Sequence, residues 1–306
     1  MSNQFEDLRN NILNYDFTVL CLDIGGGGIK MGVYKINPIV RIPLLISTVK
    51  QFSIKGEKTL ENVFEHFQKK IKNTTKFDFV CTSMASTEKI FDNWRLMTKN
   101  NKIKIKNVIS NVFEKKYGLK YFEKNDIFCH SLACRSVSGI LDKKISSVTF
   151  VFGTSPSLIV INENGEKVEK SGGLIKNREY LWQTFLNEDL GSKSCTEYPP
   201  KNNKNRSSSL DNWIKENKYY FFKIWNKLLK PIFISNGNKY LNGWTGKAPK
   251  FIFLSGGMSQ YRLAGYVGLM NNWLQASSDN YKNTQIILAP RYSGLMGAAC
   301  LPFTPL

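Results

Sequence analysis

The sequence predicts an α/β protein built from two similar halves. Apolar runs rich in β-branched residues recur along the chain, and segments with helical spacing lie between them. The pattern opens with two strands around a glycine turn, and after Ser147 it begins again with a second strand pair around a turn of small residues. Because strands that alternate with helices are typical of α/β domains, each half is expected to fold around its own sheet.

The predicted strands and helices can be placed in chain order from the period of the apolar residues. The strands cover Phe17 to Leu22, Ile29 to Tyr34, Leu44 to Phe52, Phe77 to Thr82, Ser147 to Phe152, Ser157 to Asn162, Phe251 to Leu254 and Thr284 to Leu288. The clearest helices cover Thr59 to Lys72, Lys106 to Tyr117, His130 to Leu141, Leu210 to Leu229, Tyr261 to Ala276 and Ser293 to Leu301. A stretch rich in Pro, Asn, Lys and Ser, from Glu197 to Ser209, is typical of a disordered loop.

The composition is that of a strongly basic globular protein. Its 306 residues are 42% hydrophobic, which is enough for substantial cores. Lys and Arg number 43 against 24 Asp and Glu, giving a formal net charge of +19, and such a charge can attract an anionic partner. The basic residues are scattered among Asn and Ile, and no recognition motif accompanies them, so the sequence argues against a nucleic-acid partner.

The cysteines and the N-terminal segment indicate a reducing compartment. The six cysteines form no CxxC pair and most of them lie in apolar runs, where a thiol packs as a small hydrophobe. The first residues are too polar and acidic for a signal peptide, and no apolar run approaches the ~18 residues of a membrane span. We therefore expect a cytoplasmic protein with no membrane partner.

The first glycine turn has the form of a phosphate loop. A strand that ends at Asp23 is followed by Gly25, Gly26, Gly27 and Gly28, and another strand begins at once. Glycines leave backbone N–H groups free to face an anion. Because the chain returns as a strand, the turn belongs to a hairpin and differs from the strand, turn and helix of the Walker and dinucleotide-binding loops.

Three further turns or small-residue segments follow. Gly153 and Thr154 lie in the turn of the second strand pair, within "VFGTSPSLIV". Gly256 and Gly257, in "FLSGGMSQ", follow a buried strand and open into a helix, so that the backbone could closely approach a nucleobase or ribose. Small residues in "SGLMGAACL" require a tightly packed helix. Together these four segments outline a cleft.

In order and approximate spacing, the four segments resemble those of the ROK sugar kinases, relatives of actin, hexokinase and the Hsp70 ATPase. The resemblance covers nearly the whole chain. It implies a two-lobed actin-like ATPase (ribonuclease H-like) fold, with mixed sheets flanked by helices and a cleft between the lobes. It also implies an N-terminal α/β lobe of residues 1–125, joined by a C-terminal helix at 293–306, and a C-terminal α/β lobe of residues 126–292.

The resemblance implies ATP-dependent phosphorylation of a hexose or an amino sugar, with Mg²⁺ as the metal. It makes Asp126 the catalytic base and Asn125 a sugar contact, while the glycine turns hold the nucleotide. Asp23 closes a buried strand beside the phosphate turn, where a carboxylate can either act on Mg²⁺ through its waters or simply cap the turn. A second register, meaning a second alignment of the segment around Asp126 with the family pattern, is open. In it "IFC" is a strand and "HSLACRSVSG" is the following helix. That register puts His130 and Ser131 where the acid belongs, and leaves the site without a base.

Several positions depart from the family pattern. Of the family's zinc motif only Cys195 survives, so no structural zinc is expected, while Glu197 stands where the family has a sugar-contacting glutamate. Gly27 replaces a threonine of the relatives, and Pro156 removes an amide donor from the second loop, so phosphate binding should be weakened. Lys30, on the return strand, is expected to be a solvated face residue. An alternative function therefore stays open, a catalytically silent regulatory protein that binds a sugar or nucleotide, and so does a homodimer.

Overall fold

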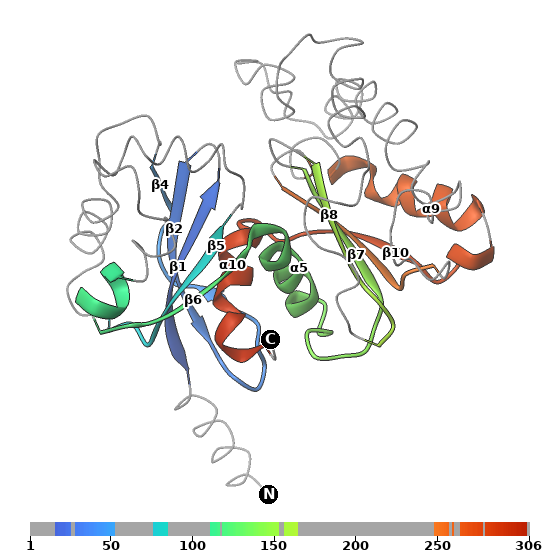
Figure 1. Cartoon of the computed structure of the whole chain (residues 1–306). Coiled ribbons are helices and arrows are strands. Elements are labelled where there is room, and N and C mark those ends of the chain that lie inside the picture. The colour runs from blue at the N-terminus through green and yellow to red at the C-terminus, as the bar shows by residue number, and fades with distance from the viewer. Residues whose placement is uncertain are drawn as a thin grey trace, which may run out of the picture. The chain divides into compact units, whose positions relative to one another are not determined.

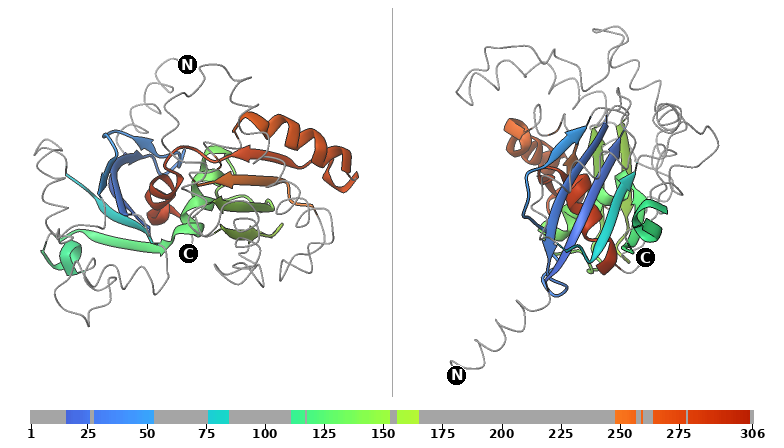
Figure 2. Two further views of the ribbon diagram at one scale, coloured as in Figure 1. Left: turned by 90° about the horizontal axis from the view of Figure 1, so that it is seen from above. Right: turned by 90° about the vertical axis from the view of Figure 1, so that its left-hand side faces the viewer.

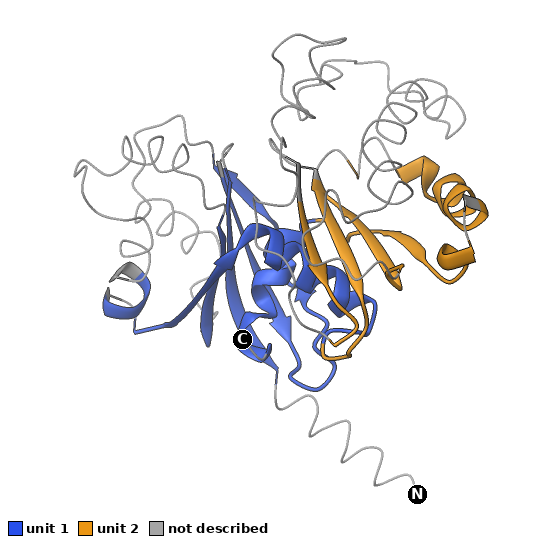
Figure 3. Cartoon of the chain, turned by 45° about the vertical axis from the view of Figure 1, so that its right-hand side comes forward, with its two compact units in different colours: residues 1–141, 292–306 blue, residues 142–291 orange. Residues whose placement is uncertain are grey.

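The chain forms two compact units, which Figure 3 distinguishes by colour. The first contains residues 1–141 and 292–306, and the second contains residues 142–291. The computed structural model describes residues 16–25, 28–52, 76–84, 111–116, 118–152, 156–164, 248–256, 259, 264–277 and 279–304.

The first unit is built on a mixed sheet of six strands (Figure 1). The strand order is β3-β2-β1-β5-β6, and β4 also pairs with β2. β1 is antiparallel to β2 and parallel to β5, which is in turn parallel to β6. The strands are β1 (Phe17–Gly25), β2 (Gly28–Ile36), β3 (Leu44–Leu45), β4 (Lys50–Phe52), β5 (Phe79–Met84) and β6 (Lys120–Asn125).

The first hairpin positions the predicted phosphate loop. Its register pairs Gly25 with Gly28 and therefore Asp23 with Lys30. β1 is buried along most of its length, from Val19 to Leu22 and again at Ile24, which explains its continuous apolar run. Both halves of the hairpin are thus held in the core up to the residues that flank the turn.

Two helices, α5 (Asp126–Val137) and α10 (Ser293–Ala299), pack against one face of this sheet and against each other (Figures 1 and 2). Their contact is very close, because a Cβ atom at Gly297 would lie 1.6 Å from the backbone oxygen of Cys129. This close contact requires glycine and explains the small residues of the C-terminal helix. A π-helical turn (Asn111–Lys116) precedes β6, and a short 3₁₀ helix (Leu301–Phe303) follows α10.

The second unit repeats the topology of the first. Its strand order is β10-β9-β7-β8, with β7 antiparallel to β8 and parallel to β9, and β9 parallel to β10. A hairpin followed by two parallel strands is thus found in both sheets, as the sequence predicted for two similar halves. The strands are β7 (Ser147–Phe152), β8 (Pro156–Ile161), β9 (Phe251–Ser255) and β10 (Gln285–Leu288).

The helix α9 (Val267–Ser277) protects the edge strand of the second sheet. The side-chain amide of Asn271 donates to the carbonyl of Ile286 at 3.0 Å, and its oxygen accepts from the N–H of Ile286 at 2.7 Å. The edge of β10 is thus paired with a side chain in place of a further strand. Short 3₁₀ turns at Ala264–Tyr266 and Asp279–Tyr281 flank this helix. Among the described residues, no helix is long and apolar enough to span a membrane.

The structure differs from the predicted elements in three places. The strand expected over 44–52 is two separate strands, and β6 was not predicted at all. The helix expected from His130 begins four residues earlier, at Asp126, so the "IFC" strand of the second register is wrong. Because α5 packs on α10, the first compact unit extends to Leu141, beyond the lobe boundary expected after residue 125. The helices expected at 59–72 and 210–229 lie outside the described residues.

Candidate functional site

Polar side chains of the first unit gather where three neighbouring parallel strands end. Asp23 lies near the carboxyl end of β1, Ser83 near the end of β5, and Asn125 is the last residue of β6. The register pairs Asp23 with Ser83 and places Ser83 beside Lys124, one residue before Asn125. Open α/β sheets bind their ligands at the carboxyl ends of such strands. We therefore take this edge as the candidate site.

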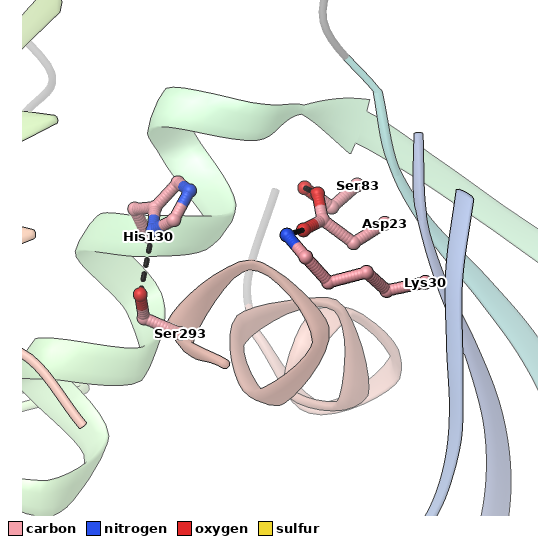
Figure 4. A network of polar contacts seen from close by, with 5 residues as sticks. All are labelled: Asp23, Lys30, Ser83, His130 and Ser293. Atoms are coloured by element: carbon pink, nitrogen blue, oxygen red, sulfur yellow. Dashed lines mark hydrogen bonds and ion pairs between the residues drawn. The ribbon is translucent and has the colours of Figure 1, made fainter. Parts of the chain in front are cut away.

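Asp23 is the centre of the polar network (Figure 4). Its Oδ2 atom lies 3.1 Å from the Nζ atom of Lys30, and its Oδ1 atom accepts a hydrogen bond from the Ser83 hydroxyl at 3.2 Å. The Asp23 side chain is only 13% exposed, whereas that of Lys30 is 38% exposed. Lys30, which was expected only to be a solvated face residue, therefore also contacts the carboxylate of the site through its ammonium group.

The helix α10 limits where the Asp23 carboxylate can lie. A Cβ atom at Gly294 would come within 2.9 Å of both Cγ and Oδ1 of Asp23. The missing side chain at Gly294 therefore makes room for the carboxylate. This gives the small-residue helix a second role, beside its contact with α5.

Asp126 begins α5 directly after β6. Asn125 is the N-cap of this helix, and its Oδ1 atom accepts from the Ile127 N–H at 3.1 Å, while Oδ1 of Asp126 accepts from the same N–H at 2.8 Å. An Asn cap followed by an acidic residue in the first turn is a favourable helix start. The strand-to-helix junction thus places the Asn125 and Asp126 pair at the same sheet edge as Asp23.

Burial and a neighbouring charge make Asp126 an unusual carboxylate. Removal from water raises its pKa to about 6, and the negative charge of Asp23 adds to this effect. A carboxylate whose pKa is this close to neutrality is a stronger base than an ordinary aspartate and is still mostly ionised at pH 7.

His130, one turn into α5, contacts the start of α10. Its Nδ1 atom lies 2.7 Å from the hydroxyl oxygen of Ser293, and Figure 4 shows this pair beside the Asp23 network. Burial lowers the pKa of His130 to about 4, although the charge of Asp23 opposes the shift. The ring is therefore neutral at pH 7 and joins the two helices by a hydrogen bond without adding charge to the site.

In the second unit, the structure places one of the predicted nucleotide-binding glycines at a strand end. Gly256 follows β9 with φ of 90°, a conformation that favours glycine, and its carbonyl accepts a hydrogen bond from the Ser259 hydroxyl at 2.8 Å. The turn therefore has no side chain at Gly256, and the contact of this glycine with adenosine stays a prediction.

The structure brings Asp23, Gly25, Asn125 and Asp126 to one sheet edge, all within the first unit. Apart from Gly256 in the second unit, the other predicted site residues lie outside the described residues, namely Gly26, Gly27, Gly153, Thr154, Glu197 and Gly257, together with Cys195 of the zinc motif. Two polar residues of the site were missed, Ser83 and Ser293. Both lie next to their partners only in the folded chain, since 60 residues separate Ser83 from Asp23 and 163 separate Ser293 from His130.

Sequence comparisons identify no relative of the chain. No protein-family profile matches it, and neither does any curated protein.

Solved structures with the same arrangement are numerous. A ROK family protein of Streptococcus pneumoniae TIGR4, solved with sucrose, has a TM-score of 0.55 at 13% identity, over 94% of this chain and 98% of that one. The ROK hexokinase of Thermus thermophilus has a TM-score of 0.54 at 14% identity, over 93% and 97%. The chain has the ROK sugar-kinase fold. This confirms the actin-like α/β fold class that the four glycine and small-residue segments predicted.

The ROK fold is also found in a protein that is described as a regulator. A ROK family transcriptional regulator, a homologue of the E. coli MLC protein, has a TM-score of 0.51 at 11% identity, over 96% of this chain and 78% of the regulator. The ROK fold thus occurs in kinases and in a regulator, so the function must be argued from the site.

Proposed function

We propose that the chain is an ATP-dependent kinase that phosphorylates a hydroxyl group of a hexose or an amino sugar. The observation that carries the proposal is Asp126, a carboxylate with a raised pKa at the junction of β6 and α5, beside Asp23. Sugar phosphorylation needs a carboxylate that can take the proton of the accepting hydroxyl.

In the proposed reaction, Asp126 accepts the proton of the sugar hydroxyl as its oxygen attacks the γ-phosphorus of ATP. The bond between the γ-phosphorus and its bridging oxygen breaks, so the products are a sugar phosphate, ADP and a proton on Asp126 that passes to solvent. Asn125 is the neighbouring sugar contact. The turns at Gly25 and Gly256 supply backbone groups for the phosphates and the adenosine.

The residues at Asp23 fit a hydrated Mg²⁺. Mg²⁺ usually keeps several waters and binds through one or two carboxylates together with substrate phosphates. Asp23 offers a partly exposed carboxylate at the strand end, fixed by Ser83 and Lys30. When bound there, the ion would neutralise charge on the transferred phosphoryl group.

The proposal is tested by ADP release from MgATP, measured across a panel of hexoses and amino sugars. We expect turnover that depends on one of these sugars, and a fall of at least about 100-fold in kcat for Asp126→Asn, because general-base catalysis contributes 10²–10⁴-fold. The matched control is Asp279→Asn, the same chemical change at an aspartate whose side chain is 88% exposed.

The control variant should keep the activity of the unchanged chain. Sugar-dependent turnover that survives in Asp126→Asn would remove Asp126 as the base. A folded chain that releases no ADP with any sugar would contradict the kinase proposal as a whole.

A second candidate function is supported by the ion pair between Asp23 and Lys30. Because the ammonium group already neutralises the carboxylate, Asp23 has less charge available for Mg²⁺. Together with the altered phosphate loops, this favours a regulatory protein that binds a sugar or nucleotide without turnover. Calorimetry distinguishes the two: sugar binding with no ADP release supports the regulator, and sugar-dependent ADP release excludes it.

A further inference from the structure

Bulky aliphatic side chains are exposed on one segment of the first unit, residues 39–46, which we call the apolar segment. It holds six of the eight large hydrophobic side chains that are exposed among the described residues: Ile39, Val40, Ile42, Leu44, Leu45 and Ile46. Ile39 is 71% exposed and Leu44 65%. A contiguous group of this kind marks an interaction surface more often than isolated exposed residues do.

The apolar segment is held in place by hydrogen bonds at both ends. Oδ1 of Asn37 accepts from the N–H groups of Ile39 at 2.8 Å and Val40 at 3.1 Å, and the N–H of Ile46 donates to Val33 at 2.9 Å. In the middle, the carbonyl of Arg41 accepts from the Ser136 hydroxyl of α5 at 2.5 Å. The aliphatic side chains are therefore presented to solvent by an ordered backbone.

The strained backbone of Arg41 also indicates that the apolar segment is an interaction surface. Arg41 has φ of 55°, in the left-handed region that residues other than glycine rarely adopt. Its N–H donates to the carbonyl of Asn37 at 2.8 Å and its Nε to that of Pro38 at 2.8 Å. Conformations of this kind persist only where surrounding contacts impose them, and they are enriched at binding sites.

Along the sequence, the charges in and next to the apolar segment have one sign. Between Asp23 and Glu57 the sequence contains no acidic residue, whereas Lys35 and Arg41 lie beside or within the segment. Lys35 is exposed and is paired with Leu44 across the β2 and β3 ladder. The whole chain carries a net charge of +19, which adds a long-range attraction toward anionic surfaces.

We propose that the apolar segment docks on the surface of an anionic phospholipid bilayer, contrary to the sequence-based expectation of no membrane partner. Ile39, Val40 and Leu44 would enter the boundary between headgroups and acyl chains, while the exposed Lys35 would face the lipid phosphates. This contact is peripheral and is separate from the candidate catalytic site, so it does not depend on the proposed kinase activity.

The observations favour a bilayer over two other occupants. A second copy of the chain would bring one cationic segment against another, and the segment itself contains no acidic residue to compensate. Protein interfaces also carry about one hydrogen bond per 100–200 Å². Here the N–H groups of Ile39, Val40 and Arg41 are already bonded within the chain, β3 is only two residues long, and Pro43 before it has no N–H. A bilayer needs no such directional partners.

The test is sedimentation of the full chain with vesicles of phosphatidylcholine and phosphatidylserine, and with vesicles of phosphatidylcholine alone. We expect binding to the anionic vesicles that weakens at high salt, and a loss of at least about 10-fold in partitioning for Leu44→Asp and for Ile39→Asp. The control is Leu269→Asp on α9, which makes the same change in charge at a leucine that is 39% exposed. Circular dichroism verifies that each variant is folded.

Binding that is lost in both variants of the apolar segment and kept in Leu269→Asp supports the proposal. An equal loss in all three variants would show attraction by net charge alone and overturn it. Failure of the unchanged chain to bind anionic vesicles would also overturn it. So would a dimer, detected by sedimentation velocity, that Leu44→Asp dissociates, because the segment would then be a protein interface.

Discussion

Replacing Gly297 by alanine should strongly destabilise the first unit. The new Cβ atom would lie 1.6 Å from the carbonyl oxygen of Cys129, where contacts under 3.0 Å do not occur, so α5 and α10 would have to separate by about 1.4 Å. The new Cβ atom meets backbone atoms of Cys129 in the buried helix α5, so no flexible side chain can move aside. Overpacking costs 1–3 kcal/mol and sometimes more, so we expect a loss of about 3 kcal/mol in the free energy of unfolding.

Thermal unfolding followed by circular dichroism measures this effect. For a unit of this size, about 3 kcal/mol corresponds to a fall of roughly 6–12 °C in Tm. The control is Gly268→Ala, because nothing lies within 4 Å of a Cβ atom at that position of α9. It should leave Tm unchanged or raise it slightly, since alanine favours a helix by up to ~1 kcal/mol over glycine. A Gly297→Ala variant that unfolds within 1–2 °C of the unchanged chain, the resolution of such a measurement at roughly 0.5 kcal/mol, would refute the close helix contact.

Three other predictions concern the site and the core. Gly294→Ala should push the Asp23 carboxylate away, since the new Cβ atom would lie 2.9 Å from its Cγ. We expect kcat to fall by about 10–100-fold with little change in the KM for sugar. An unchanged kcat would argue against a role for Asp23. The pKa of Asp126 is raised to about 6, and its ionised form is the base, so kcat/KM should fall as pH drops through about 6; a midpoint below about 4.5 would contradict this assignment. In the folded chain at pH 8, a thiol reagent should label at most one of the six cysteines rapidly, because five are buried and burial raises the pKa of each. Rapid labelling of two or more cysteines would contradict a closed core. The buried five are Cys21, Cys81, Cys129, Cys134 and Cys300.

The sequence predicts most of the sheets because their strands are buried. β1, β7 and β9 are continuous apolar runs, and the pattern identifies them directly. The apolar pattern does not predict β6, because its sequence, KYFEKN, contains three charged residues and only two that favour a strand, the adjacent Tyr121 and Phe122. Pairing with β5 makes it a strand, and that pairing is a long-range contact that no local pattern reports.

The start of α5 could have been predicted from local signals. Asn125 is a good N-cap residue and Asp126 in the first turn suits the helix dipole, whereas the apolar spacing alone predicts a start at His130. The contact between Lys30 and Asp23 could also have been found. If only Gly26 and Gly27 form the turn, the antiparallel register places Lys30 directly opposite Asp23.

The contacts of Ser83 and Ser293 could not be predicted, because they depend on how distant elements pack. Ser83 reaches Asp23 through the parallel pairing of β1 and β5, and Ser293 reaches His130 through the packing of α10 on α5. Neither residue type is distinctive in its own segment. Hydroxyl groups at strand or helix ends usually cap or face solvent, and only the fold directs these two toward the site.

The two sheets share one topology but carry different groups at the ends of their strands. In the first sheet, the ends of β1, β5 and β6 bring together Asp23, Ser83 and Asp126. In the second sheet, the described residues that follow β9 and β10 include Gly256 and Ala289 and no carboxylate. A duplicated sheet therefore provides ionisable side chains at one edge and accessible backbone at the corresponding edge of its repeat. Proton transfer needs the former and close approach to a nucleotide needs the latter, so the proposed kinase uses the same topology for two different tasks.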